Sequence, residues 1–155
     1  MSAFLLPLGI GFVSGLRSLT GITAVSWAAH YGWLDLHGTS QEYLGSPAAV
    51  VIFSVLAFAE YVADKLPRTP NRINAGPLIA RMVTGGISGT AIAVSAHQTP
   101  LSGLLLGWIG AVIGAYTGYS MRKRLVARLG VKDIAVAIPE DLVAIGLALL
   151  IVAGR

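Results

Sequence analysis

The sequence predicts an all-α membrane protein, a polytopic bundle of about five transmembrane helices, and three observations support this fold class. Hydrophobic residues make up 55% of the 155 residues, whereas charged residues make up only 12%. A soluble domain carries about 25% charged residues, so most of this surface must face something other than water. Apolar stretches of about 20 residues, the length that crosses a bilayer core, recur along the chain. The length leaves room for one domain, residues 1–155.

Five apolar stretches predict the membrane spans, which we place at 3–29, 47–66, 77–96, 101–121 and 134–153. Glycines, Pro7 and Arg17 interrupt the first span, so we expect a broken helix there. Pro47, Pro77 and Pro100 stand at or near the starts of later spans, where the missing N–H costs nothing.

The distribution of basic residues predicts the orientation of the chain. Lys65, Arg68 and Arg72 follow the second span, and a cluster of Lys and Arg over 122–132 follows the fourth. The other two connections, 30–46 and 97–100, contain no Lys or Arg. The positive-inside rule then predicts a multi-pass protein of the inner (cytoplasmic) membrane with a cytoplasmic N-terminus. Because most of the cations lie in short stretches between the apolar runs, they indicate topology and exclude a nucleic-acid-binding face.

Glycine is patterned along two of the predicted spans. Small residues at four-residue spacing let helices approach closely in lipid, so we expect helix packing at these positions: Gly85, Gly89, Gly103, Gly107, Gly110, Gly114 and Gly118. The pattern G-x-x-S-G occurs at 11–15 and again at 85–89, a weak sign of an internal repeat. The small bundle leaves a large lipid-facing perimeter, which is compatible with a homo-oligomer.

Charged residues inside the apolar stretches are the candidate site. Each costs about 2.5–3.5 kcal/mol on insertion scales and so requires an explanation. Glu60 and Asp64 are four residues apart and share a helix face. We expect a polar cluster at the cytoplasmic side, made of Arg17, Glu60, Asp64, Arg68, Arg72, Arg81, Glu140 and Asp141. The alternatives are structural ion pairs and, for Glu140 and Asp141, carboxylates that complement a helix dipole in a first turn.

Familiar catalytic and cofactor motifs are missing from the sequence. No Walker loop, G-x-S-x-G elbow or H-E-x-x-H motif is present, and there is no cysteine. His30, His37 and His97 stand at predicted outer helix ends or loops, without a carboxylate cluster at ligand spacing. We therefore expect no metal and no cofactor, and favour a non-enzymatic role. The cations of 64–74 could contact anionic lipid headgroups as well as set topology.

Nearly the whole chain resembles the bacterial membrane proteins grouped as domain of unknown function family 4126. The resemblance is carried by 14–18 (SGLRS), 24–30 (AVSWAAH), 60–70 (EYVADKLPRTP) and 140–142 (EDL). It implies a membrane location and no established activity.

The function that the sequence favours is a small transporter or channel-like protein for a small ion or polar solute. Charge within the membrane and glycine-broken spans are the features that point to it. Two alternatives remain: a membrane-embedded enzyme that handles lipid or phosphate, and a non-catalytic scaffold or accessory subunit.

Overall fold

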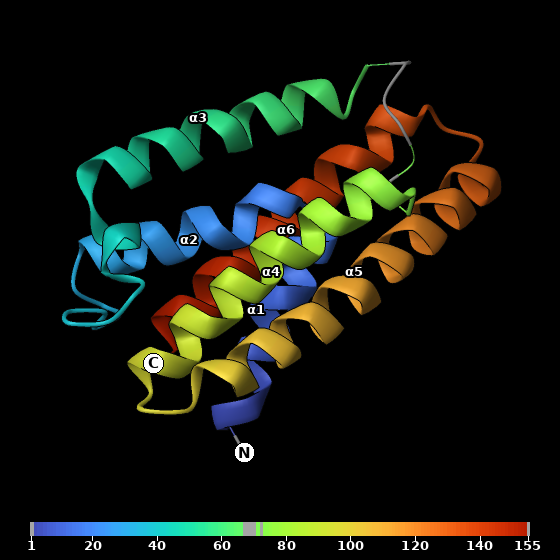
Figure 1. The fold of residues 1–155 in the computed structure, drawn as a ribbon. Coiled ribbons are helices and arrows are strands. Elements are labelled where there is room, and N and C mark those ends of the chain that lie inside the picture. Colours follow the sequence, from blue (N-terminus) through green and yellow to red (C-terminus); the bar gives the residue numbers. More distant parts are fainter. Residues whose placement is uncertain (1, 67–70, 72, 155) are drawn as a thin grey trace.

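The computed structural model describes residues 2–66, 71 and 73–154, and these residues contain helices and no strand. Figure 1 shows the six α-helices, which form one bundle. Their bounds are α1 Ser2–Leu16, α2 Ser18–His30, α3 Pro47–Ala63, α4 Ala75–Ser95, α5 Pro100–Leu129 and α6 Asp133–Ala153. A short 3₁₀ helix, η1 (Glu42–Gly45), precedes α3. The prediction of an all-helical fold is therefore confirmed.

The first predicted span, 3–29, is broken at Arg17 as expected, and the chain reverses there. A Cβ on Gly21 of α2 would overlap the Ser14 side chain and lie 3.1 Å from the Ile10 carbonyl oxygen of α1. In a continuous helix these residues would be two to three turns apart, so the contact requires α2 to fold back along α1. The single span over 3–29 is thus replaced by a helical hairpin, which Figure 1 shows in blue.

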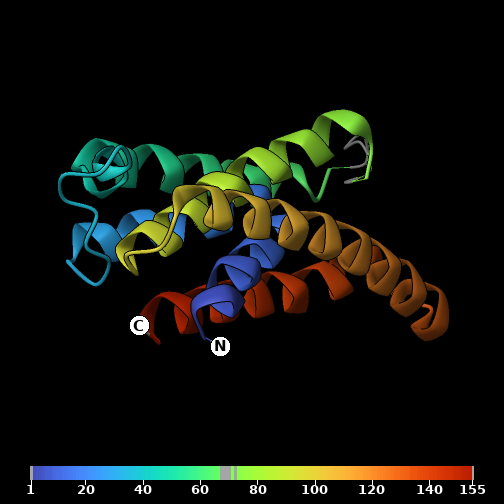
Figure 2. The ribbon, with the colours of Figure 1, turned by 60° about the horizontal axis from the view of Figure 1, so that its bottom comes forward.

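Glycine contacts also give the direction of α1. Gly11 and Gly15 of α1 face Gly107 and Ala111 of α5 respectively, so α1 and α5 run parallel. Both termini consequently lie at one end of the bundle (Figure 2), together with the connection from α4 to α5. The predicted cytoplasmic N-terminus rests on the assumption that residues 3–29 cross the membrane once. The hairpin at Arg17 does not support that assumption.

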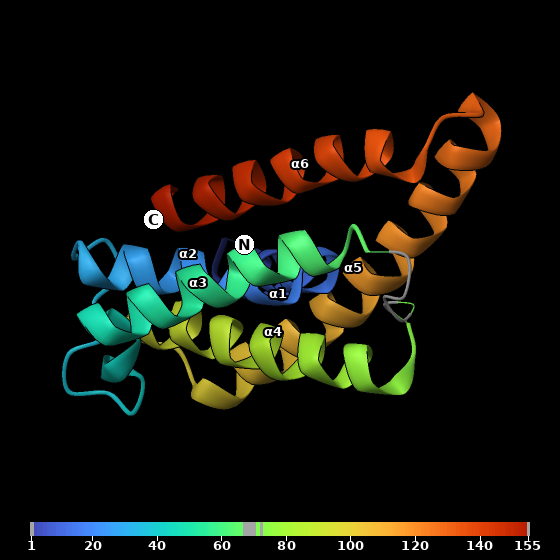
Figure 3. The same ribbon diagram turned by 90° about the horizontal axis from the view of Figure 1, so that it is seen from above.

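The opposite end, here called the basic end, holds the α1–α2 break and the turn between α5 and α6. The end of α3 and the start of α4 also lie there, as Figure 3 shows. α5 continues beyond its predicted end at 121 as a basic helix, and it stops at Gly130, whose φ of 61° is left-handed. Such a conformation is readily adopted by glycine, which explains the stop.

Three helices, α4, α5 and α6, are long and apolar enough to cross a membrane. Helix α3 and residues Phe4–Leu16 of α1 are apolar but shorter. The bounds of α3, α4 and α6 agree with the predicted spans within a few residues. Membrane helices are therefore supported. Of the five predicted spans, three correspond to described helices that are long and apolar enough to cross a membrane.

Close backbone contacts fix α5 against α1 and α4. A Cβ on Gly107 would overlap the carbonyl oxygen of Gly85 in α4, and a Cβ on Gly114 would overlap that of Phe12 in α1. The G-x-x-S-G segments of α1 and α4 both lie against this part of α5. These contacts hold the end of α1, and with it Arg17, in the centre of the basic end.

Candidate functional site

Arg17 forms the break between α1 and α2 and is the centre of the candidate site. Its backbone is extended, with φ −140° and ψ 112°, so it belongs to neither helix. Its guanidinium is completely buried, with an exposed fraction of 0%. Because Gly21 allows α2 to pack closely on α1, the turn is tight and Arg17 points into the bundle rather than into lipid.

The break leaves helix ends whose backbone groups need partners, and two opposite charges supply them. Arg81 of α4 donates from Nη1 to the carbonyl oxygens of Gly15 and Leu16, at 2.8 and 2.9 Å. Glu60 of α3 accepts from the backbone N–H groups of Ser18 and Leu19 at 2.8 and 2.9 Å. A cation thus lies at the C-terminal end of α1 and a carboxylate at the N-terminal end of α2, as the helix dipoles favour.

Arg17 itself is held by carboxylates from two other helices. Its Nη1 lies 2.7 Å from Asp64 Oδ2, just after α3, and its Nη2 pairs with Asp141 Oδ1 of α6. The ring of Tyr61 lies beside the guanidinium, 5.5 Å from its carbon to the ring centroid. Arg17 therefore links the hairpin to α3 and α6 at once.

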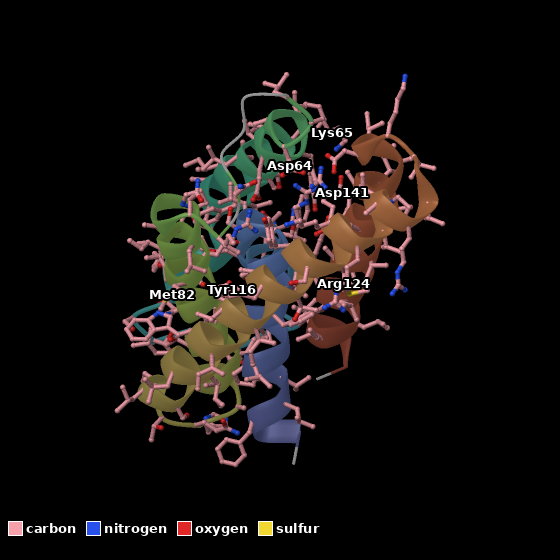
Figure 4. All side chains as sticks on the ribbon, turned by 90° about the vertical axis from the view of Figure 1, so that its right-hand side faces the viewer. Asp64, Lys65, Met82, Tyr116, Arg124 and Asp141 are labelled. Atoms are coloured by element: carbon pink, nitrogen blue, oxygen red, sulfur yellow. The ribbon has the colours of Figure 1, made fainter. Side chains whose placement is uncertain are left out.

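Arg122 and Lys65 extend these pairs into a larger network. Arg122 of α5 contacts Asp64 at 2.7 Å, Glu140 at 3.7 Å and, through Nε, Asp133 at 2.8 Å. Lys65 Nζ lies 3.0 Å from Asp141 Oδ2 and donates to the Tyr61 carbonyl oxygen at 2.9 Å. Figure 4 shows Asp64, Lys65 and Asp141 gathered in one region, away from Met82 and Tyr116.

We call this group the charged network; its members are Arg17, Glu60, Asp64, Lys65, Arg81, Arg122, Asp133, Glu140 and Asp141. Each of the α-helices that the structure describes contributes side chains, or backbone groups at its end, to this network. Opposite charges at these distances stabilise one another strongly where water is scarce.

Six of the eight predicted cluster residues meet in the charged network: Arg17, Glu60, Asp64, Arg81, Glu140 and Asp141. The other two, Arg68 and Arg72, lie outside the described residues, as does most of the loop expected to contact lipid headgroups. The dipole alternative for Glu140 and Asp141 does not hold, because α6 begins at Asp133 and places both beyond its first turn.

Sequence reasoning missed Lys65, Arg122 and Asp133 as members of the network. Lys65 and Arg122 count among the cations that predict topology, and Asp133 is not singled out. The spacing contained a usable signal for one of them, since Lys65 directly follows Asp64 at the end of the same apolar stretch. Nothing in the local sequence indicated that Arg122 reaches α3, 58 positions away.

The carboxylates of the network are arranged around cations and N–H donors rather than around one another as metal ligands would be. In the parts of the chain that the structure describes, no group of three or more His, Cys, Asp or Glu side chains could hold a metal ion. The carboxylates of Glu60, Asp64 and Asp141 instead face guanidinium, ammonium or backbone N–H donors.

The histidines lie at the other end of the bundle. His30 contacts the Gly45 carbonyl oxygen at 3.0 Å, and His37 lies 3.2 Å from Glu42 Oε1. The hydrogen bonds from His37 and from the backbone N–H of Gly38 lower the pKa of Glu42 below its ordinary value. These contacts order the exposed connection 31–46 and are remote from the charged network.

Comparison with known proteins assigns the chain to a family. No curated protein and no solved structure matches it. A family model does match, over residues 4–153, which include α2 to α6, all but the first two residues of α1 and every member of the charged network. The chain therefore belongs to the family described as domain of unknown function (DUF4126).

Proposed function

We propose that the chain is a small transporter or channel-like protein for a small ion or polar solute, and that the charged network is its site. The observation that carries the proposal is the hairpin tip, where the fully buried Arg17 joins two helix ends to ionic side chains of α3 and α6. Helices interrupted inside a membrane, with their ends facing charges, are typical of transporter binding sites.

The depth of the network supports this proposal. Between Asp141 and the end of α6 lie residues 142–153, which span about 18 Å at 1.5 Å per residue. Between Arg81 and the end of α4 lie residues 82–95, which span about 21 Å. Since the hydrocarbon core is about 30 Å thick, helix ends at one membrane surface put the network about 10 Å inside the other.

Ionisable residues inside a membrane mark substrate or ion pathways and proton relays in many membrane proteins. Two features of this network favour an exchangeable site. Arg17 Nε makes no hydrogen bond to any described residue, although it is buried. Lys65 is the most exposed cation of the network, at 27%, and shares Asp141 with Arg17. An incoming ion or proton could therefore replace Lys65 at Asp141 while Arg81 and Glu60 keep the break in place.

The proposed orientation follows from the positive-inside rule applied to the observed fold. The basic end carries Lys65, Lys123, Arg124, Arg128 and Lys132 and would face the cytoplasm. The N-terminus and the end of α6 would then both face outward. The network would open toward the cytoplasm, as expected for a site loaded or emptied on that side.

Solute flux in proteoliposomes tests the proposed function. Na⁺, K⁺, H⁺, chloride and phosphate are screened, first with the wild-type chain and then with Asp141→Asn, which removes one charge with little change in shape. Asp35→Asn is the matched control, because Asp35 is an exposed acid outside the network. We expect flux of one of these ions that Asp141→Asn reduces at least tenfold and Asp35→Asn leaves unchanged.

Either of two results would overturn the proposal. One is the absence of flux for every ion with the folded wild-type chain. The other is flux that folded Asp141→Asn carries at the wild-type rate. Both results would favour the scaffold alternative, in which the ion pairs only hold the helices together.

A further inference from the structure

The groove between α5 and α6 is a second feature, which borders the charged network at Arg122 and Glu140. A cavity of about 330 Å³ lies between the C-terminal half of α5 and the N-terminal half of α6. Its walls are almost wholly apolar, and α1 provides the floor through Phe12 and Leu16. Figure 3 shows α5 and α6 diverging from the turn that joins them.

The groove continues toward the other end of the bundle. A second apolar cavity of about 340 Å³ is also lined by Phe12 and extends along α1 to Leu5, between the same two helices. Leu5, Leu8, Phe12 and Leu16 lie on one face of α1, at spacings of three and four residues. The two cavities therefore meet at Phe12 and lie along the same face of the hairpin's first helix.

The length of the groove fits an acyl chain. From Thr117 to Leu129 the first cavity follows α5 for about 18 Å, close to the thickness of one leaflet. Its walls are almost wholly apolar over this length, so the groove offers an acyl chain a path along one leaflet.

Cations stand beside the end of the groove that is nearest the turn between α5 and α6. Arg124 and Arg128 follow Thr117 and Met121 at helical spacing, so they continue the stripe of α5 that borders the cavity. Both are exposed, and neither forms an ion pair with any residue that the structure describes. Figure 4 shows Arg124 apart from Asp64, Lys65 and Asp141.

These cations differ from Arg122, which also borders the cavity but already faces Asp64, Asp133 and Glu140. A phosphate would therefore be attracted to the unpaired arginines, whose planar guanidinium groups match it well. Charge at the groove's end and hydrocarbon along its length match the two parts of a phospholipid.

We propose that this groove binds one anionic phospholipid, with an acyl chain along Phe12 and Leu16 and the phosphate at Arg124 and Arg128. The site does not depend on the proposed transport function. It is distinct from the lipid annulus, because an annular lipid would not be selected by two particular arginines.

Native mass spectrometry of the chain released from vesicles of equal phosphatidylglycerol and phosphatidylcholine tests the proposal. We expect the wild-type chain to retain one phosphatidylglycerol. The variant Arg124→Gln/Arg128→Gln should retain it at least about tenfold less, since each cation near headgroups contributes about 1 kcal/mol. Lys123→Gln is the matched control, because Lys123 lies against the Tyr119 ring, 5.9 Å from its centroid.

A second pair of variants tests the apolar part of the groove. Ala135→Phe fills the cavity from its α6 wall, whereas Ala153→Phe adds the same ring to an exposed position of α6 that does not line it. Retention should fall in the first variant only. Three results would each overturn the proposal. They are equal retention of both lipids, unchanged retention in Arg124→Gln/Arg128→Gln and Ala135→Phe, and a lipid-free dimer that Ala135→Phe disrupts. The dimer would show that a second copy of the chain occupies the groove.

Discussion

At the scale of single residues, Arg17 shows how a cation can be stable inside an apolar bundle. Its guanidinium has no contact with water and is balanced by Asp64 and Asp141. Burying the three groups is costly, and only their mutual attraction offsets that cost. The individual charges were identifiable from the sequence, because each interrupts an apolar stretch. Their pairing was not, because it joins residues up to 124 positions apart, from Arg17 to Asp141.

We expect Arg17→Met to lower the free energy of unfolding by about 3–5 kcal/mol, because it leaves two buried carboxylates without their shared partner. Equilibrium unfolding in detergent micelles or bicelles measures the change. Arg17→Met/Asp141→Asn should recover part of the loss, since it removes one of the two carboxylates that lose a cation. A loss no larger than that of Arg128→Met, at an exposed position, would contradict a balancing role for Arg17.

The connection 31–46 should respond to acid through Glu42. Its pKa is lowered in the folded chain by the hydrogen bonds from His37 and from the Gly38 backbone N–H. For a carboxyl group with a lowered pKa, the stabilisation is fully present above the ordinary pKa and is lost as the pH falls through the folded value. The Gly38 amide resonance should report this transition in an NMR titration, and Glu42→Gln should remove it. A Gly38 resonance that shifts identically in both proteins would contradict the contact.

At the scale of elements, the hairpin α1–α2 is the main difference from the sequence-based prediction. A 27-residue apolar stretch, 3–29, has the length of one membrane span, and helix breaks within spans are common. What reverses the chain is tertiary: Arg81 and Glu60 bind the two helix ends, and Gly21 admits the contact with α1. The other helices were predictable, because a long apolar run with prolines and charges at its ends can be recognised from the local sequence alone.

Helix α5 is held by backbone contacts that leave no space for a side chain. We expect Gly107→Ala to cost about 1–3 kcal/mol, because the new methyl group would meet backbone of α4, which cannot move aside as a side chain would. Gly146→Ala is the control, since a Cβ there has nothing within 4 Å. The same unfolding assay compares the two. Equal free energies of unfolding for Gly107→Ala and Gly146→Ala would contradict this prediction. They would mean that α4 and α5 move apart at Gly107 without cost.

At the scale of the whole molecule, the six helices alternate in direction, so the second three are inverted relative to the first three. The G-x-x-S-G segments fall in α1 and α4, the first helix of each half. An inverted repeat would produce this arrangement, but so would any bundle of six helices with short connections, and the repeat stays a prediction. The hairpin has a firmer consequence, because it brings both termini to one end of the bundle.

That consequence can be measured by cysteine labelling, since the chain has no cysteine of its own. A membrane-impermeant maleimide applied to intact cells should label a cysteine placed ahead of Ser2 and Thr99→Cys, at the non-basic end. It should label Val131→Cys, in the turn between α5 and α6, only after lysis. If Thr99→Cys is labelled from outside and the N-terminal cysteine is not, residues 2–30 cross the membrane once and the hairpin is wrong. If Val131→Cys is labelled in intact cells while the N-terminal cysteine and Thr99→Cys are labelled only after lysis, the hairpin stands and the inward orientation of the basic end is wrong. Only labelling of both the N-terminal cysteine and Thr99→Cys, with protection of Val131→Cys, agrees with the fold and the positive-inside rule together.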